Sequence, residues 1–290
     1  MSEFTFELGG CRWFKEEVTG AIGHAVRIDN LLFEGEIEHQ HIIVFENEVF
    51  GRLFALNGFI QLSTIDEFIY HEMVTHVPLF AHPNPQRVLV IGGGDGGALR
   101  EILRHRNVEK VTLVEIEADV IEFSRKWFPD VCRDAFDDPR VTITIADGAK
   151  FVHETDERFD VVIVDSTDPV GPGVVLFTED FYAGCKRVLN AGGVMVTQCG
   201  LPFLQPDELK RASDNQRASF GRVQFYTITV PAYSGGVMTL GFATDGDRGA
   251  DEADLVGERV RKSGLSFKYY NPDVHAAAFK LPEYIGEIVA

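Results

Sequence analysis

The 290-residue sequence predicts an α/β protein in which a small antiparallel β-domain precedes a mostly parallel sheet with helices on both faces. Apolar, strand-like runs alternate with helical patterns from Val88 onward, which is typical of βαβ units. A glycine-rich turn, Gly92–Gly97, directly follows the first of these runs and opens a helix. Before Thr64, by contrast, short strand-like segments follow one another without helices between them.

The N-terminal region is expected to form the antiparallel domain. Three stretches have the apolar pattern of strands: Ala25–Asp29, Glu36–Glu46 and Val49–Leu56. Asn57-Gly58 is a strong hairpin signal, and Thr64–Phe80 has apolar residues at helical spacing. The proline-punctuated stretch Ala81–Gln86 marks a joint. The predicted domains are therefore residues 1–80, β-strands with a connecting helix, and residues 81–290, a Rossmann-like domain.

The second domain is predicted from a regular succession of strands and helices. The strands of the parallel sheet are expected at Val88–Ile91, Lys110–Ile116, Val141–Ala146, Phe159–Asp165 and Val194–Gln198. Helices are expected from the glycine turn to about His105, at Ala118–Phe128 and at Asp180–Leu189. Gln224–Val230 and Val237–Ala243 have the pattern of a final antiparallel pair. Methyltransferase-like sheets use this strand layout.

The charge balance limits the partners. A net charge of -18 disfavours nucleic acids and anionic membrane surfaces, which repel an acidic protein, and suits cationic ligands. No pair among the four scattered cysteines has metal-ligand spacing, so we expect reduced thiols, no metal and a cytoplasmic protein. Neither a secretory signal nor a membrane-spanning apolar segment is expected.

Acidic residues follow four of the predicted parallel strands. Asp95 lies in the glycine turn, and Glu115, Asp147 and Asp165 close the next three strands. Ligands of such sheets bind beyond the carboxyl ends of the strands. Glu115 comes about 20 residues after the turn, the spacing at which an acid binds a ribose diol. Taken singly, Asp147-Gly148 fits an ordinary turn and Glu115 a solvated strand end; together the four acids indicate an acid-lined site.

Asp95 narrows the ligand further. A carboxylate at the centre of the turn repels a pyrophosphate, so the group bound there should be cationic. A nucleoside that carries a sulfonium satisfies both the ribose-binding acid and this charge preference.

Five separated motifs resemble the polyamine aminopropyltransferases, the spermidine synthase family, in its bacterial form. They are Val88–Glu101, Asp66–Met73, Asp165–Gly173, Val230–Tyr233 and Tyr269–Phe279. The resemblance extends from about Trp13 to the C-terminus. It implies transfer of the aminopropyl group of decarboxylated S-adenosylmethionine, a co-substrate, to putrescine, giving spermidine and 5′-methylthioadenosine. It also implies no further cofactor and a homodimer or homotetramer.

The resemblance assigns roles to individual residues. Donor-binding positions match Gln40, Asp95, Glu115, Asp147, Gly148 and Pro172. Diamine-binding positions match Gln61, Tyr70, His71, Asp95, Asp165, Ser166, Thr167, Asp168 and Tyr233. Asp165 matches the catalytic proton acceptor. Without the resemblance, Tyr70 and His71 fit core packing of a helix equally well.

The acceptor and the activity leave alternatives open. Many family members have Thr-Glu-Arg where this sequence has Ser63-Thr64-Ile65, so cadaverine or a longer polyamine is an alternative acceptor. A methyltransferase on the same sheet is a rival, but Asp95 would repel the carboxylate of S-adenosylmethionine. A non-catalytic polyamine-binding protein is the other rival, and it has no need of a base such as Asp165.

Overall fold

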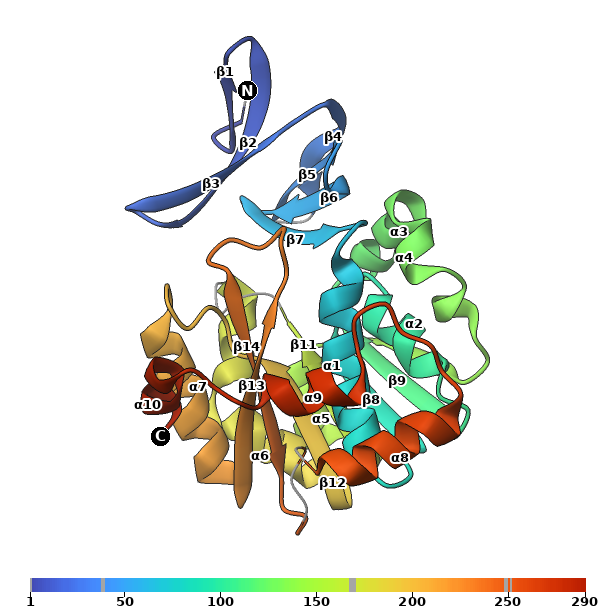
Figure 1. Cartoon of the computed structure of the whole chain (residues 1–290). Coiled ribbons are helices and arrows are strands. Elements are labelled where there is room, and N and C mark those ends of the chain that lie inside the picture. Colours follow the sequence, from blue (N-terminus) through green and yellow to red (C-terminus); the bar gives the residue numbers. More distant parts are fainter. Residues whose placement is uncertain (1, 38–39, 167–170, 248–249, 251) are drawn as a thin grey trace. The chain divides into compact units, whose positions relative to one another are not determined.

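The computed structural model describes residues 2–37, 40–166, 171–247, 250 and 252–290 (Figure 1). The chain divides into two compact units. The first comprises Met1–Glu67 together with Thr229–Gly236, and the second comprises Phe68–Ile228 and Val237–Ala290. The helix after the last N-terminal strand thus belongs, apart from its first residue, to the second unit.

The first unit consists of two antiparallel sheets. A three-stranded sheet in the order β1-β2-β3 contains β1 (Thr5–Leu8), β2 (Cys11–Thr19) and β3 (Ile22–Arg27). A four-stranded sheet contains β4 (Asn30–Ile37), β5 (Gln40–Asn47), β6 (Gly51–Leu56) and β7 (Phe59–Ser63), each paired with the next. This confirms the antiparallel β-domain that the sequence predicted.

Two differences from the prediction concern the strands of this unit. The single strand predicted at Glu36–Glu46 was wrong, because it begins in β4 and ends in β5, which pair antiparallel. Strands β1 and β2 were not predicted, and the charges around Glu16 made β2 hard to recognise. Glu16 lies in the middle of β2 between Lys15 and Glu17, and such a charged run hides the alternation of a strand. Yet Glu16 is only 4% exposed. Its carboxylate accepts the Ile60 N–H at 2.9 Å and the Ser234 hydroxyl, two donors that are distant in the sequence.

The second unit is built on a seven-stranded sheet in the order β10-β9-β8-β11-β12-β14-β13. Its strands are β8 (Arg87–Gly92), β9 (Lys110–Glu115), β10 (Val141–Ile145), β11 (Phe159–Asp165), β12 (Leu189–Gln198), β13 (Arg222–Thr229) and β14 (Val237–Thr244). The first five in sheet order pair in parallel, and β14 runs antiparallel to β12. The predicted parallel strands are therefore confirmed, β11 with the predicted bounds.

Helices cover both faces of this sheet (Figure 1). They are α1 (Glu67–Ala81), α2 (Gly97–Leu103), α3 (Ala118–Trp127), α4 (Pro129–Cys132), α5 (Gly148–Glu154), α6 (Glu179–Val188), α7 (Pro206–Ser219), α8 (Ala253–Ser263), α9 (Pro272–Ala278) and α10 (Glu283–Val289). Two 3-10 helices, η1 (Ala135–Asp137) and η2 (Gly171–Phe177), complete the unit. Helices α4, α5, α7, α8, α9 and α10 had no counterpart in the sequence prediction.

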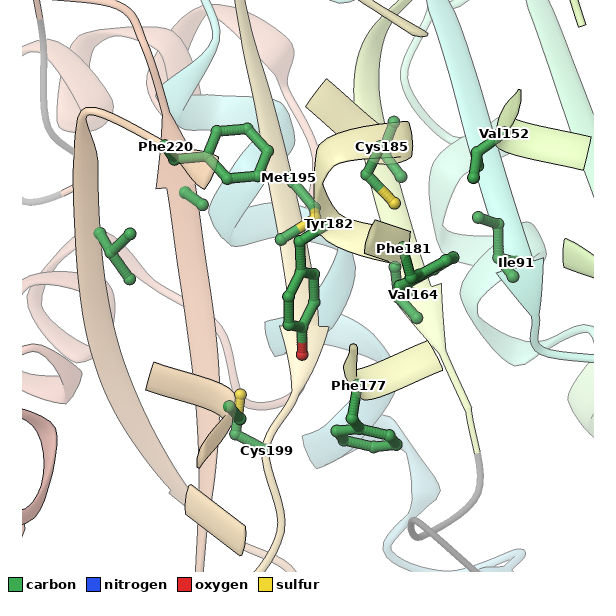
Figure 2. Packing of buried hydrophobic residues seen from close by; sticks show 14 of the residues in the cluster. Ile91, Val152, Val164, Phe177, Phe181, Tyr182, Cys185, Met195, Cys199 and Phe220 are labelled. Atoms are coloured by element: carbon green, nitrogen blue, oxygen red, sulfur yellow. The ribbon is translucent and has the colours of Figure 1, made fainter. Parts of the chain in front are cut away.

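A large apolar core lies between one face of the sheet and the helices α5, α6, α7 and α10. Figure 2 shows Phe181 and Tyr182 of α6 among side chains of β8, β11 and β12, and Tyr182 has no exposed surface. Ile91 and Val164, the last core residues of β8 and β11, also lie in this cluster. Tight packing of this kind leaves little freedom, so the strand ends that carry Gly92 and Asp165 are held in fixed register.

Candidate active site

The acids predicted at the strand ends follow four neighbouring strands of the sheet. Glu115 ends β9 and Asp165 ends β11, while Asp95 follows β8 and Asp147 follows β10. Since β10, β9, β8 and β11 are adjacent and parallel, all four acids lie along one edge. This edge is where ligands of α/β sheets bind.

Asp165 is held by β8 and by helix α1. The Gly93 N–H donates to the Asp165 carbonyl oxygen at 2.9 Å. Gly93 has φ +68, and a Cβ there would stand 3.0 Å from Asp165 Oδ2, so glycine suits both the backbone and the space. The Tyr70 hydroxyl donates to Asp165 Oδ1 at 2.6 Å. Asp165 Oδ2 has no hydrogen-bond partner within the described part of the chain. A carboxylate oxygen with unused acceptor capacity is what a proton acceptor needs.

The surroundings of Asp165 make it a stronger base than an ordinary aspartate. Burial raises the pKa of its carboxyl to about 6, and the negative charge of Asp95 adds to this rise. His71 and the Tyr70 hydroxyl act in the opposite direction and stabilise the ionised form. A base of this strength is ionised at neutral pH and still able to hold a proton.

Asp95 is bound by His71 from α1 and by the start of α2. His71 Nε2 lies 3.3 Å from Asp95 Oδ2, and the Gly97 N–H donates to Asp95 Oδ1 at 2.6 Å. Burial opposes ionisation of Asp95, but His71, the Gly97 N–H and Arg100 outweigh it and lower the pKa of the carboxyl. A Cβ on residue 97 would overlap the ring of His71, which is 1% exposed. Gly97 is therefore needed to admit the imidazole that binds Asp95.

Glu115 is shaped to accept further hydrogen bonds. Its Oε1 accepts the N–H groups of Ile116 and Glu117, at 2.8 and 3.2 Å. A Cβ on Gly94 would stand 2.7 Å from Oε2, so the glycine turn leaves room for this carboxylate. Burial raises the pKa of Glu115 to about 7, and the charges of Glu117 and Asp165 add to the rise. Vicinal hydroxyls donating to the carboxylate would stabilise its ionised form.

Asp147 has a local role that the sequence did not indicate. It is the N-cap of α5, and its side chain accepts the N–H groups of Ala149 and Lys150, at 2.8 and 3.3 Å. The turn considered for Asp147-Gly148 is thus a helix start. Two apolar side chains that the sequence analysis missed lie nearby: Ile116 follows β9 and Ile145 ends β10, and they are 52% and 49% exposed. Their exposure, which cannot be predicted from the sequence, identifies them as an apolar surface suited to a planar nucleobase.

The remaining predicted residues belong to other parts of the chain. Gln40, Gln61 and Tyr233 are in the first unit, where the Tyr233 hydroxyl donates to the Gln61 carbonyl at 2.8 Å. Asp66 holds the loop that contains Tyr233, because its Oδ2 accepts the N–H of the preceding residue, Ala232, at 2.7 Å.

Four predicted residues lie at or beyond the end of β11. Ser166 directly follows Asp165 at the end of this strand. Thr167 and Asp168 fall outside the described residues, and Pro172 lies within η2.

The described residues contain neither an evident metal-binding cluster nor a membrane-spanning helix. Among those residues, no group of three or more His, Cys, Asp or Glu side chains could hold a metal ion. No helix in the same ranges is long and apolar enough to cross a membrane.

The fold and its acidic edge define a methyltransferase-like protein suited to a nucleoside that carries positive charge. Comparison with known families is more specific. Residues 67–249 match the family described as "Spermine/spermidine synthase domain", and residues 12–72 match "Spermidine synthase tetramerisation domain". The chain therefore belongs to the spermidine synthase family, as the motifs predicted.

Individual relatives are similar over almost their whole length. Polyamine aminopropyltransferase 1 of Pseudomonas aeruginosa is 47% identical over 274 residues, which cover 94% of this chain and 96% of the relative. Polyamine aminopropyltransferase of Salmonella typhimurium is 47% identical over 276 residues, covering 95% and 96%.

Two crystal structures resemble the chain closely. A spermidine synthase in complex with the transition state analogue AdoDATO has a TM-score of 0.91 and 40% identity, covering 96% of this chain and 94% of that one. Spermidine synthase from Thermotoga maritima has a TM-score of 0.88 and 39% identity, covering 96% and 93%.

Proposed function

We propose that this protein is a polyamine aminopropyltransferase that uses decarboxylated S-adenosylmethionine as donor and putrescine as acceptor. The observation that carries the proposal is Asp165, which has a raised pKa, an oxygen without a partner among the described residues, and Asp95 and Tyr70 beside it. A pair of acids at the end of β8 and β11 suits two cationic substrates that must meet there.

The reaction is a displacement at carbon. The amine nitrogen of putrescine forms a bond to the methylene carbon beside the sulfonium, and the carbon–sulfur bond breaks. Its electron pair goes to sulfur, which leaves as the uncharged thioether 5′-methylthioadenosine. The proton lost by the nitrogen passes to Asp165 and then to solvent, and spermidine is the other product.

Asp165 cannot simply deprotonate an amine in bulk water. An ordinary ammonium has a pKa of about 10.4, roughly four units above that of Asp165, so most of the adjustment must fall on the amine. The adjacent sulfonium and the loss of water lower the amine's pKa. Asp165 then orients the nitrogen and accepts the proton, while alignment of the two substrates supplies much of the acceleration.

The other residues bind the donor. Asp95 takes the primary amine of the decarboxylated donor, and its charge disfavours the carboxylate of S-adenosylmethionine. Glu115 accepts hydrogen bonds from the ribose hydroxyls. Asp147 and Gly148 lie by the adenine, with Ile116 and Ile145 as an apolar surface.

The remaining assignments of the proposal follow the family. Gln40 and Pro172 belong to the donor site, and Gln61, His71 and Tyr233 to the acceptor site. Ser166, Thr167 and Asp168 complete the acceptor site. No cofactor beyond the co-substrate is proposed. We also propose a cytoplasmic homodimer or homotetramer, which the match to a tetramerisation domain supports.

Product analysis by mass spectrometry tests the proposal. The purified protein receives decarboxylated S-adenosylmethionine with putrescine, cadaverine, agmatine or spermidine, in parallel with Asp165→Asn and with Asp130→Asn, an exposed acid on α4. We expect 5′-methylthioadenosine and spermidine from the wild type and from Asp130→Asn, and neither from Asp165→Asn. Product from cadaverine alone would reassign the acceptor, and binding without any product would leave a polyamine-binding protein.

A further inference from the structure

Helix α1 contacts the candidate active site on one side and the C-terminal part of the chain on another. Tyr70 and His71 reach Asp165 and Asp95, as described above. Glu72 is the next residue. At about 100° per residue it lies roughly 200° around the helix from Tyr70, which is nearly the opposite side. Although it is a carboxylate, Glu72 is only 2% exposed. A buried carboxylate is costly unless strong donors surround it, so its partners are informative.

The partners of Glu72 are three consecutive backbone N–H groups of the C-terminal part of the chain. Lys268 N–H donates to Oε1 at 2.9 Å, and Tyr269 and Tyr270 N–H donate to Oε2, both at 2.8 Å. These residues lie in the segment between α8 and α9, which passes over α1 and α2 (Figure 1). The segment follows residue 249, the last residue matched by the synthase domain.

Aromatic packing makes this segment a rigid support. The Tyr270 ring stacks on Phe80 of α1, with centroids 5.6 Å apart and an interplanar angle of 18°. The Phe267 ring meets His76 edge-on at 4.7 Å. The segment is also tied to the end of α2, because Arg104 donates to the Ser266 carbonyl. It therefore holds both the helix that carries Tyr70 and the helix that begins at Gly97.

We propose that Glu72 is a positioning residue of the active site, which holds α1 against Lys268–Tyr270 so that the Tyr70 hydroxyl reaches Asp165. The inference rests on the proposed function for the role of Asp165, but the geometry that it concerns exists without substrate. Glutamine cannot replace Glu72, because its single carbonyl oxygen accepts and its NH2 group faces donors. Glu72→Gln leaves at least one buried N–H group of the segment unpaired, so the helix should shift or loosen.

The first test follows the Asp165 carboxyl by carbon-13 NMR in the free protein. Its titration midpoint depends on Asp95, His71 and Tyr70, and Asp165 in turn acts on Glu115. Loss of the Tyr70 hydrogen bond destabilises the carboxylate. We therefore expect Glu72→Gln to raise the midpoint by about one pH unit, as Tyr70→Phe should. In the Tyr70→Phe background, Glu72→Gln should add nothing.

Arg259→Gln is the matched control. Arg259 also joins the C-terminal part to α1, donating to the carbonyls of Phe80 and Ala81, both at 2.6 Å. Those carbonyls are about 15 Å along the helix from Tyr70. We expect this variant to lower the melting temperature and leave the Asp165 midpoint unchanged. An unchanged midpoint in Glu72→Gln, or an equal shift in Arg259→Gln, would overturn the proposal. If Glu72→Gln does not fold, Glu72→Asp, whose oxygens are withdrawn by one methylene, should shift the midpoint in the same direction.

Activity gives an independent readout. A midpoint that moves from about 6 to about 7 leaves roughly fivefold less ionised Asp165 at pH 6 and almost the same amount at pH 9. Turnover of Glu72→Gln relative to wild type should therefore be about fivefold lower at pH 6 than at pH 9. An equal loss at both pH values contradicts the proposal. If the wild type forms no aminopropylated product, the proposed function fails, whereas the NMR test of Glu72 still stands.

Discussion

Replacement of Gly97 by alanine tests the contact between the glycine turn and His71. The backbone of Gly97 lies outside the left-handed region, so alanine is conformationally allowed there. The obstacle is space, because the new Cβ would overlap the imidazole of His71. That ring is 1% exposed and its Nε2 lies 3.3 Å from Asp95 Oδ2, so it cannot move without disturbing Asp95.

The expected magnitude follows from two opposing contributions. Overpacking of a buried site costs about 1–3 kcal/mol. Alanine in place of glycine in a helix returns about 0.5–1 kcal/mol. A net loss of about 1–2 kcal/mol corresponds to a fall in melting temperature of about 2–8 °C. Displacement of His71 should also raise the KM for the donor, whose amine Asp95 is proposed to bind, and the KM for putrescine, because His71 itself belongs to the proposed acceptor site.

The assay combines thermal unfolding with steady-state kinetics for four variants, three single and one double. Gly286→Ala in α10 is the matched control, because among the described residues no side chain or backbone atom beyond its own helix and chain neighbours lies within 4 Å of its added Cβ. It should raise the melting temperature slightly and leave the donor KM unchanged. His71→Ala vacates the ring's volume, so Gly97→Ala in that background should be neutral or stabilising. The reasoning is refuted if Gly97→Ala is as stable as wild type, or if the double variant is no better than the single one.

Four further predictions concern three of the acids at the strand ends. The kcat/KM of the wild type should rise as Asp165 ionises, through about pH 6, and reach an alkaline optimum as the amine loses its proton; a flat profile from pH 6 to 9 would contradict this. Because the pKa of Asp165 is raised in the folded state, its proton contributes stability that is complete below about pH 3.9 and is lost as pH rises through about 6. Asp165→Asn should therefore melt at a higher temperature than wild type at pH 8 and not at pH 3.5, while its turnover falls by about 10²- to 10⁴-fold. Glu115→Gln should weaken 5′-methylthioadenosine binding by about 10- to 100-fold in calorimetry. The affinity of the wild type for 5′-methylthioadenosine should increase as pH rises through about 7, because Glu115 then ionises. Equal affinity at pH 6 and 8 would argue against ribose binding by this carboxylate. Asp147→Ala removes the cap of α5, at a cost of about 1 kcal/mol, so the melting temperature should fall by about 2–4 °C; an unchanged value would show that the cap contributes nothing.

The sheet of the second unit was predictable because its strands are buried on both faces. Such strands contain continuous apolar runs that end abruptly, as Val161–Val164 does at Asp165. The helix α7 was not predictable in this way. Its buried residues are Leu209, Ala212, Ser213 and Gln216, so half of the buried face is polar and no apolar stripe appears in the sequence.

The candidate site was predictable only in part, because some of its residues have a local sequence signal and others are brought together by contacts between distant segments. Acids that end parallel strands must gather at one edge, so the sequence alone brings Asp95, Glu115 and Asp165 together. Contacts between distant segments have no local signal. Tyr70 and Asp165 are 95 residues apart, and nothing in the sequence pairs them except the resemblance to a family. The contact of His71 with Gly97 likewise depends on how α1 packs against α2.

Thr229–Gly236 belongs to the first unit although it lies far along the chain from the other residues of that unit. This limits the positions at which the gene can recombine without disrupting the first unit. β13 and β14 are neighbours in the sheet of the second unit, yet the loop between them carries Ala232, which is fully buried in the apolar core of the first. A gene segment that encodes only the first 67 residues therefore encodes a module with a gap in its interior and leaves Asp66 without the Ala232 N–H. Recombination at the apparent boundary would separate residues that fold together. A chimaera that keeps the first unit intact must therefore take Thr229–Gly236 from the same parent as Met1–Glu67.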